Sequence, residues 1–478
     1  MNFVRSDAVA AIKRRLDHPV IDADGHLVEY LPLVRDFLVE EAGPDVAVGF
    51  DRLVHGSEFM RQVPREKKRE LGLSRTAWWG LPARNTLDRA TAMLPELLYR
   101  RLDELGLDYA LLYPTYGLVV TALGEDELRC ACARAFNRYY AEVYAEYRDR
   151  LEPVAAIPMF TPAEALAELE HAVVARGLKT GMFSGVIPRR VPGAEATRGA
   201  IYIDNVGHDG EHDYDPVWRR CAELGIAPSF HAGGQGWGTR VSRTNYVFNH
   251  IGNFAAAGEA ACRGLVLGGV PLRFPALRFA FLEGGVAWAL NFYSDLLGHY
   301  EKRNRDAIAH YDPRLLDRAQ LEKLFREHAP AAIRERLDRL DEALLMLSDP
   351  QEDRAAIDEF ADSGAASAED FRGVFERQLF FGCEADDPMN ALAFEPRFAP
   401  GGARLRAVFA SDIGHWDVPD VREVLPEAFE LVEAGLLGPD DFRAFVCDNA
   451  VDLLAGANPR FFDGTAIAGA LEPAARTR

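Results

Sequence analysis

Eight short apolar runs recur along the chain, each followed by polar residues and then by a helical pattern. The runs are almost continuously apolar, which is typical of parallel strands that are covered on both faces. Several of the helical stretches between them end in glycine, a helix stop signal. We therefore predict an α/β fold, a (β/α)8 TIM-like barrel with helical insertions. The runs lie at 19–22, 109–114, 153–158, 181–186, 227–231, 277–283, 378–383 and 406–412.

Two stretches, at about 40–100 and 300–375, are too long for simple barrel connections. The second is charged, and its helical spacing gives one apolar stripe. We expect an insertion that packs on the barrel or on a second subunit of a homo-oligomer; a peripheral hairpin that thickens the barrel wall is the alternative. A single barrel domain over 1–460 and a C-terminal tail over 461–478 complete the predicted organisation. The stripe consists of Ile333, Leu337, Leu340 and Leu344.

The charge balance limits the classes of partner. The 478 residues include 54 Lys and Arg against 74 Asp and Glu, for a formal net charge of −20. Nucleic acids and acidic membranes require an excess of basic residues, so we exclude both as partners. No run approaches 18 uncharged apolar residues and no secretory leader is apparent, so we expect a cytoplasmic protein. The six scattered cysteines favour reduced thiols.

Residues that can bind metals follow four of the predicted strands at the point where each ends. In the first, an extended Asp22-Ala-Asp24-Gly-His26 would direct its two carboxylates and its imidazole to one side. Because the carboxyl ends of barrel strands meet at one rim, all of these groups should lie close together. The others are His231 after the fifth strand, Glu283 after the sixth, and Asp412 and His415 after the eighth.

Each of these residues also has an ordinary structural explanation. The segment 22–26 could be a solvated turn, His231 a structural histidine, and Glu283 a helix cap. However, ionised carboxylates at the mouth of an apolar barrel are costly unless they are paired or metal-bound. Three carboxylates and three imidazoles gathered there therefore predict a bound cation.

These motifs resemble the amidohydrolase superfamily, and more closely its amidohydrolase-related branch, which includes aminocarboxymuconate-semialdehyde decarboxylase. The resemblance rests on D-x-[HDE]-x-H on the first strand, a histidine on the fifth, a residue before Gly-Gly on the sixth, and S-D-x-x-H on the eighth. It extends from about Val20 to 456 and implies a distorted barrel that binds one or two divalent metals.

The resemblance implies a role for each matching position. Asp24 and His26 would be ligands from the first strand, His231 from the fifth, and Asp412 a ligand or base from the eighth. Asp24 replaces the first histidine of the usual H-x-H, and Glu283 replaces the histidine of the sixth strand. The fourth-strand region "GMFSG" has no lysine to become a carboxylated bridge, which argues against a two-zinc hydrolase.

The six candidate ligands are rich in oxygen and include no thiolate, which suits Fe or Mn at least as well as Zn. We therefore expect one or two divalent ions, with Fe or Mn favoured and Zn as the alternative. The candidate ligands are Asp24, His26, His231, Glu283, Asp412 and His415.

Other residues are candidates for contact with substrate. His250 could face the substrate or cap a helix, and His208 lies in a loop that could overhang the site. Trp79 could line an acyl or aromatic pocket, with Arg84 pairing a substrate carboxylate. Trp79 and Arg84 could instead be core and surface residues of the first insertion.

We interpret the chain as a metal-dependent enzyme that hydrolyses or decarboxylates a small organic acid, with catalytic roles for Asp412, His231 and His250. A second hypothesis is a non-haem dinuclear iron or manganese oxygenase that hydroxylates a small organic acid or its thioester, because two histidines and a carboxylate also build sites that activate oxygen. A third is a non-catalytic binding protein on the same barrel.

Overall fold

Eight parallel strand positions form the barrel in the computed structural model, which describes residues 3–475 except 71–82, 195–199, 232, 235, 236, 238 and 345–357. The strands pair in the orders β1-β2-β3 and β4-β5-β8-β9-β10-β11. β3 and β4 flank Val154 and occupy one position, so each of the eight predicted runs contains a strand and the barrel prediction is confirmed. The strands are β1 (Ile21–Leu27), β2 (Tyr109–Pro114), β3 (Leu151–Pro153), β4 (Ala155–Ile157), β5 (Gly181–Phe183), β8 (Pro228–Phe230), β9 (Phe279–Phe281), β10 (Leu379–Glu384) and β11 (Arg406–Ala410).

β11 lies beside β1 and closes the barrel. The backbone N–H of Asp412 donates to the carbonyl of Asp24 at 3.1 Å, and that of His26 donates to the carbonyl of Ile413 at 3.0 Å. The carboxyl ends of these two strands are therefore neighbours, although they are far apart in the sequence.

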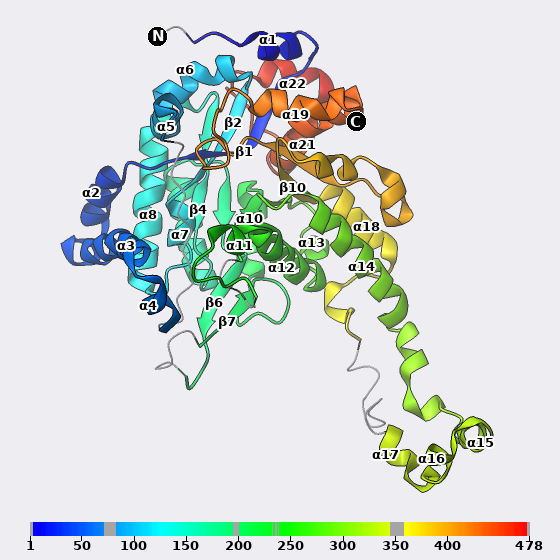
Figure 1. Cartoon of the computed structure of the whole chain (residues 1–478). Helices are drawn as coiled ribbons and strands as arrows, with labels where there is room; N and C mark the ends of the chain where they lie inside the picture. Colours follow the sequence, from blue (N-terminus) through cyan, green and yellow to red (C-terminus); the bar gives the residue numbers. More distant parts are fainter. Residues whose placement is uncertain are drawn as a thin grey trace.

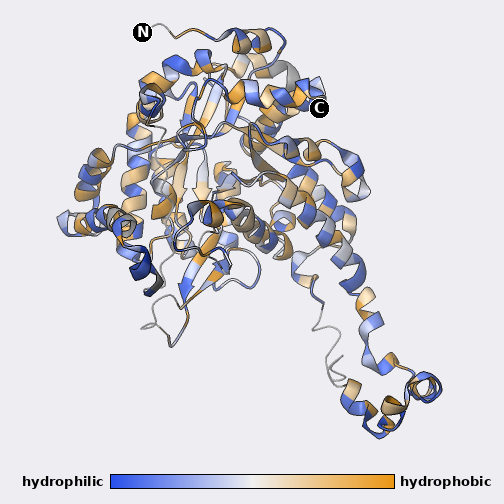
Figure 2. Cartoon of the chain, in the orientation of Figure 1, coloured by the Kyte–Doolittle hydropathy of each residue, from blue (hydrophilic) through white to orange (hydrophobic). Residues whose placement is uncertain are grey.

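Helices surround the barrel, and polar residues lie mainly on these helices while the strands are largely apolar (Figures 1 and 2). An antiparallel hairpin, β6 (Val186–Arg190) and β7 (Ile201–Asn205), extends away from the body after β5. The main helices around the barrel are α8 (Asp126–Val143), α9 (Pro162–Leu169), α10 (Asp215–Leu224), α12 (Asn253–Leu267), α14 (Ala287–Arg303), α18 (Ala368–Arg377), α19 (Val424–Glu433) and α21 (Asn449–Ala457); shorter ones are α7 (Gly117–Val120), α11 (Tyr246–His250), α13 (Val270–Arg273) and α20 (Pro439–Arg443).

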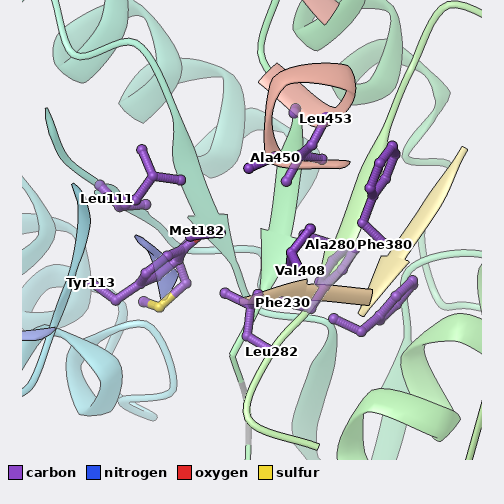
Figure 3. Close-up of a cluster of buried hydrophobic side chains, with 14 of the residues drawn as sticks. Leu111, Tyr113, Met182, Phe230, Ala280, Leu282, Phe380, Val408, Ala450 and Leu453 are labelled. Atoms are coloured by element: carbon purple, nitrogen blue, oxygen red, sulfur yellow. The ribbon is translucent and has the colours of Figure 1, made fainter. Parts of the chain in front are cut away.

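Aromatic side chains from neighbouring strands stack within the core. The Phe230 and Phe281 rings lie 5.3 Å apart, and the Phe281 and Phe381 rings lie 6.1 Å apart, each pair nearly parallel. Figure 3 shows Phe230 with Leu282 and Val408 in this cluster. Each fully buried large apolar side chain contributes about 1.5–3 kcal/mol, so the strands that carry the rim residues are held firmly in place.

The first insertion begins at Leu31, earlier than the predicted residue 40. It is tied to the barrel mouth by two hydrogen bonds: Val28 N–H donates to the carbonyl of Ala92 at 2.8 Å, and Val421 N–H donates to Asp88 Oδ2 at 3.0 Å. The insertion therefore forms part of the surroundings of the rim. Its helices are α2 (Leu31–Ala42), α3 (Pro44–Gln62), α4 (Arg65–Glu70), α5 (Thr86–Met93) and α6 (Pro95–Leu105).

The second insertion forms an arm that projects away from the barrel (Figure 1). The predicted apolar stripe is not one helix, because Ile333 lies on α16, Leu337 begins a 3-10 turn and Leu340 begins α17. The described part of the arm thus extends outward rather than thickening the barrel wall. The arm contains α15 (Arg318–His328), α16 (Ala331–Arg334) and α17 (Leu340–Leu344).

Packing continues beyond residue 460, where the barrel domain was expected to end. Phe461 and Phe462 are buried, and their rings lie 6.4 and 5.6 Å from that of Tyr109. α22 (Ala468–Ala475) follows, close to α1 (Asp7–Lys13) in Figure 1. Across the described residues, no helix has the length and apolar character needed to cross a membrane.

Candidate metal centre

A β-bulge at the end of β1 determines where its polar residues point. The pairing of β1 with β2 shifts register between Asp22 and Gly25. Asp22 accepts hydrogen bonds from the backbone N–H of Ser411 at 3.0 Å and from its hydroxyl at 2.5 Å. A Cβ atom at residue 25 would lie 2.5 Å from Asp22 Oδ2, so the bulge requires glycine there. Asp22 therefore ties β1 to β11 and does not belong to the groups that Asp24 and His26 form.

Asp24, His26 and His231 meet inside the barrel mouth. The Nε2 atoms of the two histidines are 3.2 Å apart, and each lies 3.8 Å from Asp24 Oδ1. All three side chains are almost completely buried. Ligands bound at about 2.0–2.2 Å to one ion lie no more than about 4.4 Å apart, so these three atoms can share a cation.

Glu283, Asp412 and His415 complete the cluster. Glu283 Oε2 lies 3.1 Å from His231 Nε2, and Asp412 Oδ1 lies 3.3 Å from His26 Nε2 and 2.8 Å from His415 Nδ1. Donor atoms of His26, Glu283, Asp412 and His415 all lie within 4.8 Å of one another. The structure thus brings together all six residues that the sequence proposed as ligands.

The donor atoms fit a divalent cation on the evidence of their own surroundings. Asp24 Oδ1 and Glu283 Oε2 are fully buried, and neither accepts a hydrogen bond from any residue that the structure describes. Leaving a buried carboxylate oxygen without a partner costs on the order of 1–3 kcal/mol or more. A cation between these oxygens and the histidine nitrogens would remove that cost.

The electrostatics of the cluster lead to the same conclusion. Burial and the nearby Asp412 raise the pKa of Asp24 and of Glu283 well above their usual values. Burial lowers the pKa of His231 to about 4 and that of His26 well below normal, so both imidazoles are neutral and can donate lone pairs. Carboxyl groups that resist ionisation beside neutral histidines form a site that a positive ion would stabilise.

Asp412 and His415 behave differently from the other groups. Burial opposes ionisation of Asp412, but the charge and the hydrogen bond of His415 outweigh it and lower the pKa of this carboxyl. Burial also opposes a charge on His415, yet Asp412 raises its pKa above the ordinary value. The two side chains therefore form a buried ion pair next to the proposed ligands.

Two of the rim residues have strained backbones. The φ angles of Glu283 and Asp412 are 56° and 49°, in the left-handed region that residues other than glycine seldom adopt. Such strain costs of order 1–3 kcal/mol and is concentrated at functional sites. Here it turns both carboxylates into the barrel mouth immediately after β9 and β11.

Two acidic residues of the centre were missed by the sequence analysis. Glu384 ends β10, and with Glu283 and Asp417 it forms a second group whose oxygens lie within 4.8 Å of one another. Burial together with Asp412 raises the pKa of Glu384 to about 8 and that of Asp417 to about 7. Glu384 could have been found, because it directly follows the predicted seventh strand and so had to lie on the same rim.

His250 lies beside the centre. It lines a cavity of about 210 Å³ with Glu283, Glu384 and Phe254. Its ring lies 4.9 Å from that of Tyr246 and 5.7 Å from that of Trp416, so an aromatic wall covers one side of the site. Burial lowers the pKa of His250.

His208, another substrate candidate, is not one of the residues grouped at the centre. His208 lies 3.4 Å from Asp209 and 3.5 Å from Asp362, and it lines a separate cavity beside α12. The structure therefore gives no support to its expected position over the site. Arg84 is exposed just before α5, and Trp79 lies outside the described residues.

Comparisons with known proteins place these observations in a wider context. A family model described as "Amidohydrolase" matches residues 21–347. No curated protein sequence matches the chain.

Several solved structures are similar to the chain at low identity. An amidohydrolase from Mycobacterium avium subsp. paratuberculosis K-10 is 18% identical, with 77% of this chain and 75% of that one covered and a TM-score of 0.47. A dihydroxybenzoic acid decarboxylase from Polaromonas sp. JS666, with bound manganese, is 15% identical, with coverage of 91% and 97% and a TM-score of 0.47. A 5-carboxyvanillate decarboxylase from Novosphingobium aromaticivorans DSM 12444, complexed with manganese, is 12% identical, with coverage of 95% and 98% and a TM-score of 0.48.

Proposed function

The chain belongs to the amidohydrolase family, and from that premise we propose that it is a metal-dependent enzyme that decarboxylates or hydrolyses an organic acid at the barrel mouth. The observation that carries the proposal is the buried cluster of histidine nitrogens and carboxylate oxygens contributed by β1, β8, β9 and β11. Unpartnered oxygens on Asp24 and Glu283 have no evident structural purpose, whereas as ligands they would be satisfied.

In this proposal Asp24, His26, His231 and Glu283 hold the ion. A divalent cation there would polarise an oxygen of the substrate and orient its carboxylate. The neutral His26 and His231 supply lone pairs, and the carboxylates balance the charge of the ion. The strained backbones of Glu283 and Asp412 keep these side chains in place before substrate arrives.

The ion pair of Asp412 and His415 would move the proton. Asp412 Oδ1 lies close to both His26 and His415, so it borders the ligands and also a group that can carry a proton. In a decarboxylation, the protonated His415 imidazole can give its proton, by way of Asp412, to the carbon that has lost carbon dioxide; in a hydrolysis, the ionised Asp412 can accept a proton from an attacking water. His250, on the covering wall, would contact the substrate.

The test is an assay of purified protein of known metal content. A panel of aliphatic and aromatic acids and of amides is incubated in air and under nitrogen, and carbon dioxide release and amide cleavage are followed. Turnover under nitrogen that stops after treatment with a chelator, and returns when metal is added, is the expected result. A protein that retains no metal after purification and reconstitution would contradict the proposal.

A second candidate function is a dinuclear iron or manganese oxygenase acting on an organic acid or its thioester. One specific observation favours it: Glu283 belongs to both the group with His26 and Asp412 and the group with Glu384 and Asp417. A carboxylate shared between two oxygen-rich groups suits a pair of iron or manganese ions. Turnover that needs oxygen and a reductant, and that stops under nitrogen, would favour this function over the first.

A further inference from the structure

A second pocket lies near the barrel mouth, between the first insertion and the segment that leads into α12. Its volume is about 250 Å³, and it is lined by Arg65, Val241, Ser242, Arg243, Thr244 and Phe248. Arg65 begins α4, and the other residues lie just before or within α11. The pocket lining thus combines elements that are distant in the sequence; α4 and α11 are labelled in Figure 1.

The pocket contains two arginines, Arg65 and Arg243. Neither Arg65 nor Arg243 has an acidic group within ion-pair distance among the residues that the structure describes. The chain has 74 acidic residues and a net charge of −20. In such a chain, two arginines that line one pocket and have no acidic partner among the described residues are unusual. Guanidinium groups bind carboxylate and phosphate oxygens through paired N–H donors.

The loop that presents Arg243 is held in a fixed shape. The buried side chain of Asn249 accepts a hydrogen bond from Ser242 N–H at 2.5 Å and donates one to the Ser242 carbonyl at 2.9 Å. The Ser242 hydroxyl in turn accepts from Asn245 N–H at 3.1 Å. Arg243 therefore projects from a braced turn, which lowers the entropy lost when it binds an anion.

The pocket and the candidate metal centre use different faces of α11. Tyr246 and His250 are four residues apart, so they share one face, and their rings contact each other and Trp416 beside the centre. Phe248 lies midway between them in sequence and faces the arginine pocket. Because a helix with its side chains is about 10–12 Å across, the two sites are on the order of 10 Å apart.

We propose that the Arg65 and Arg243 pocket binds a second anionic group of the substrate, while the acid that reacts lies at the metal centre. This inference rests on the proposed function, since it names the class of substrate: an organic acid with a further carboxylate or phosphate about 10 Å from the reacting group. The pocket is smaller than the roughly 300–1,000 Å³ of whole-ligand sites, which suits one end of a longer molecule. Val241 and Phe248 supply an apolar border for the connecting carbon atoms.

The test measures anion binding by the metal-loaded protein, without turnover. Pyrophosphate and succinate are each titrated by calorimetry at low ionic strength into the wild type, into Arg65→Gln/Arg243→Gln, and into the control Arg305→Gln/Arg334→Gln. The control pair is also exposed and removes the same charge from the region of the arm. The metal content of all three proteins is also measured. Anion binding at the metal centre itself would be the same in every variant, so it can be told apart from binding at the pocket.

We expect the pocket variant to bind the preferred anion at least tenfold more weakly than the wild type, and the control to differ by less than twofold. Preference for pyrophosphate would identify a phosphorylated substrate, and preference for succinate a dicarboxylate. Equal binding by the wild type and the pocket variant, or no binding of either anion by the wild type, would overturn the inference and leave two solvated surface arginines. A failure of the proposed function would appear instead as loss of metal, a separate measurement.

Discussion

His26 and His231 direct their Nε2 atoms to within 3.2 Å of each other although 205 residues separate them in the sequence. His26 lies on β1 and His231 directly follows β8, and these two strands belong to different sheets of the barrel wall. Burial keeps both imidazoles neutral by lowering the pKa of each. Two neutral nitrogens facing one point form a natural pair of metal ligands, and the first prediction follows from this geometry.

We predict that Asp24→Ala and His26→Ala each remove bound metal while the barrel stays folded. Each substitution deletes a donor atom that lies within 3.8 Å of the others. Turnover should fall by roughly 10²-fold or more, the size typical of a lost charge-stabilising group. Elemental analysis, together with circular dichroism to monitor the fold, checks the prediction. Near-normal metal content in both variants would refute the assignment of these ligands.

Glu283→Gln tests whether this carboxylate is a ligand or a bridge. The substitution keeps the size of the side chain but removes its charge, and Glu283 borders both acidic groups of the centre. We expect at least one equivalent of metal to be lost or bound much more weakly. The control is Glu395→Gln on the surface, where the glutamate pairs only locally with Arg397. If Glu283→Gln kept the metal stoichiometry and the rate of the wild type, the assignment of Glu283 as a ligand or bridge would be wrong.

Because the candidate ligands are rich in oxygen, we predict that the enzyme is more active with Fe or Mn than with Zn. Protein sites in general bind Zn more tightly than Fe or Mn. A competition for binding therefore does not show which ion supports activity. Metal-free protein reconstituted in turn with each of the three ions should be most active with Fe or Mn. Isolation from its own cells with stoichiometric zinc, and full activity in that form, would contradict this prediction.

Glu168 should make stability depend on pH. This buried carboxyl accepts a hydrogen bond from Asn137 at 2.6 Å, and burial raises its pKa from 4.5 to about 8. The folded state therefore binds the proton more tightly than the unfolded state. Between pH 4.5 and about 8 the Glu168 contribution to the free energy of unfolding falls as pH rises, and it is constant above that range.

Glu168→Gln, which mimics the protonated carboxyl, should abolish that part of the pH dependence. Its free energy of unfolding relative to the wild type should rise from pH 5 to pH 8.5 by an amount on the order of a few kcal/mol. Denaturant melts at both pH values give the difference, and the control is the exposed Glu127→Gln on α8, the helix that carries Asn137. A difference that stays constant with pH would show that Glu168 is ionised in the folded protein.

The sequence predicted the barrel and the six clustered ligand candidates for one physical reason. Parallel strands buried on both faces appear as apolar runs, and their carboxyl ends must share a rim, so residues such as His231 and Glu283 could be assigned to one site without any knowledge of distances. Glu384 obeys the same rule and was missed because the run that precedes it was taken to end at Cys383.

Other features depend on geometry that residue patterns do not encode. Strict alternation along β1 would place Asp22 with Asp24, but the bulge redirects it to Ser411. His208 lies between strands in the sequence, yet the β6–β7 hairpin carries its loop to Asp362. The stripe from Ile333 to Leu344 has helical spacing, but the backbone breaks between α16 and α17. In each case a local turn overrides the periodicity.

The bonds between Asp22 and Ser411 join residues 389 positions apart, and this has a consequence for how the protein is made. A nascent chain begins to fold while it is being synthesised, and its N-terminal part folds first. Here Asp24 and His26 are made early, but Asp412 and His415 exist only after nearly all of the barrel has been translated. The complete cluster of six candidate ligands therefore cannot form during most of synthesis, and it is finished only after β11 has been added.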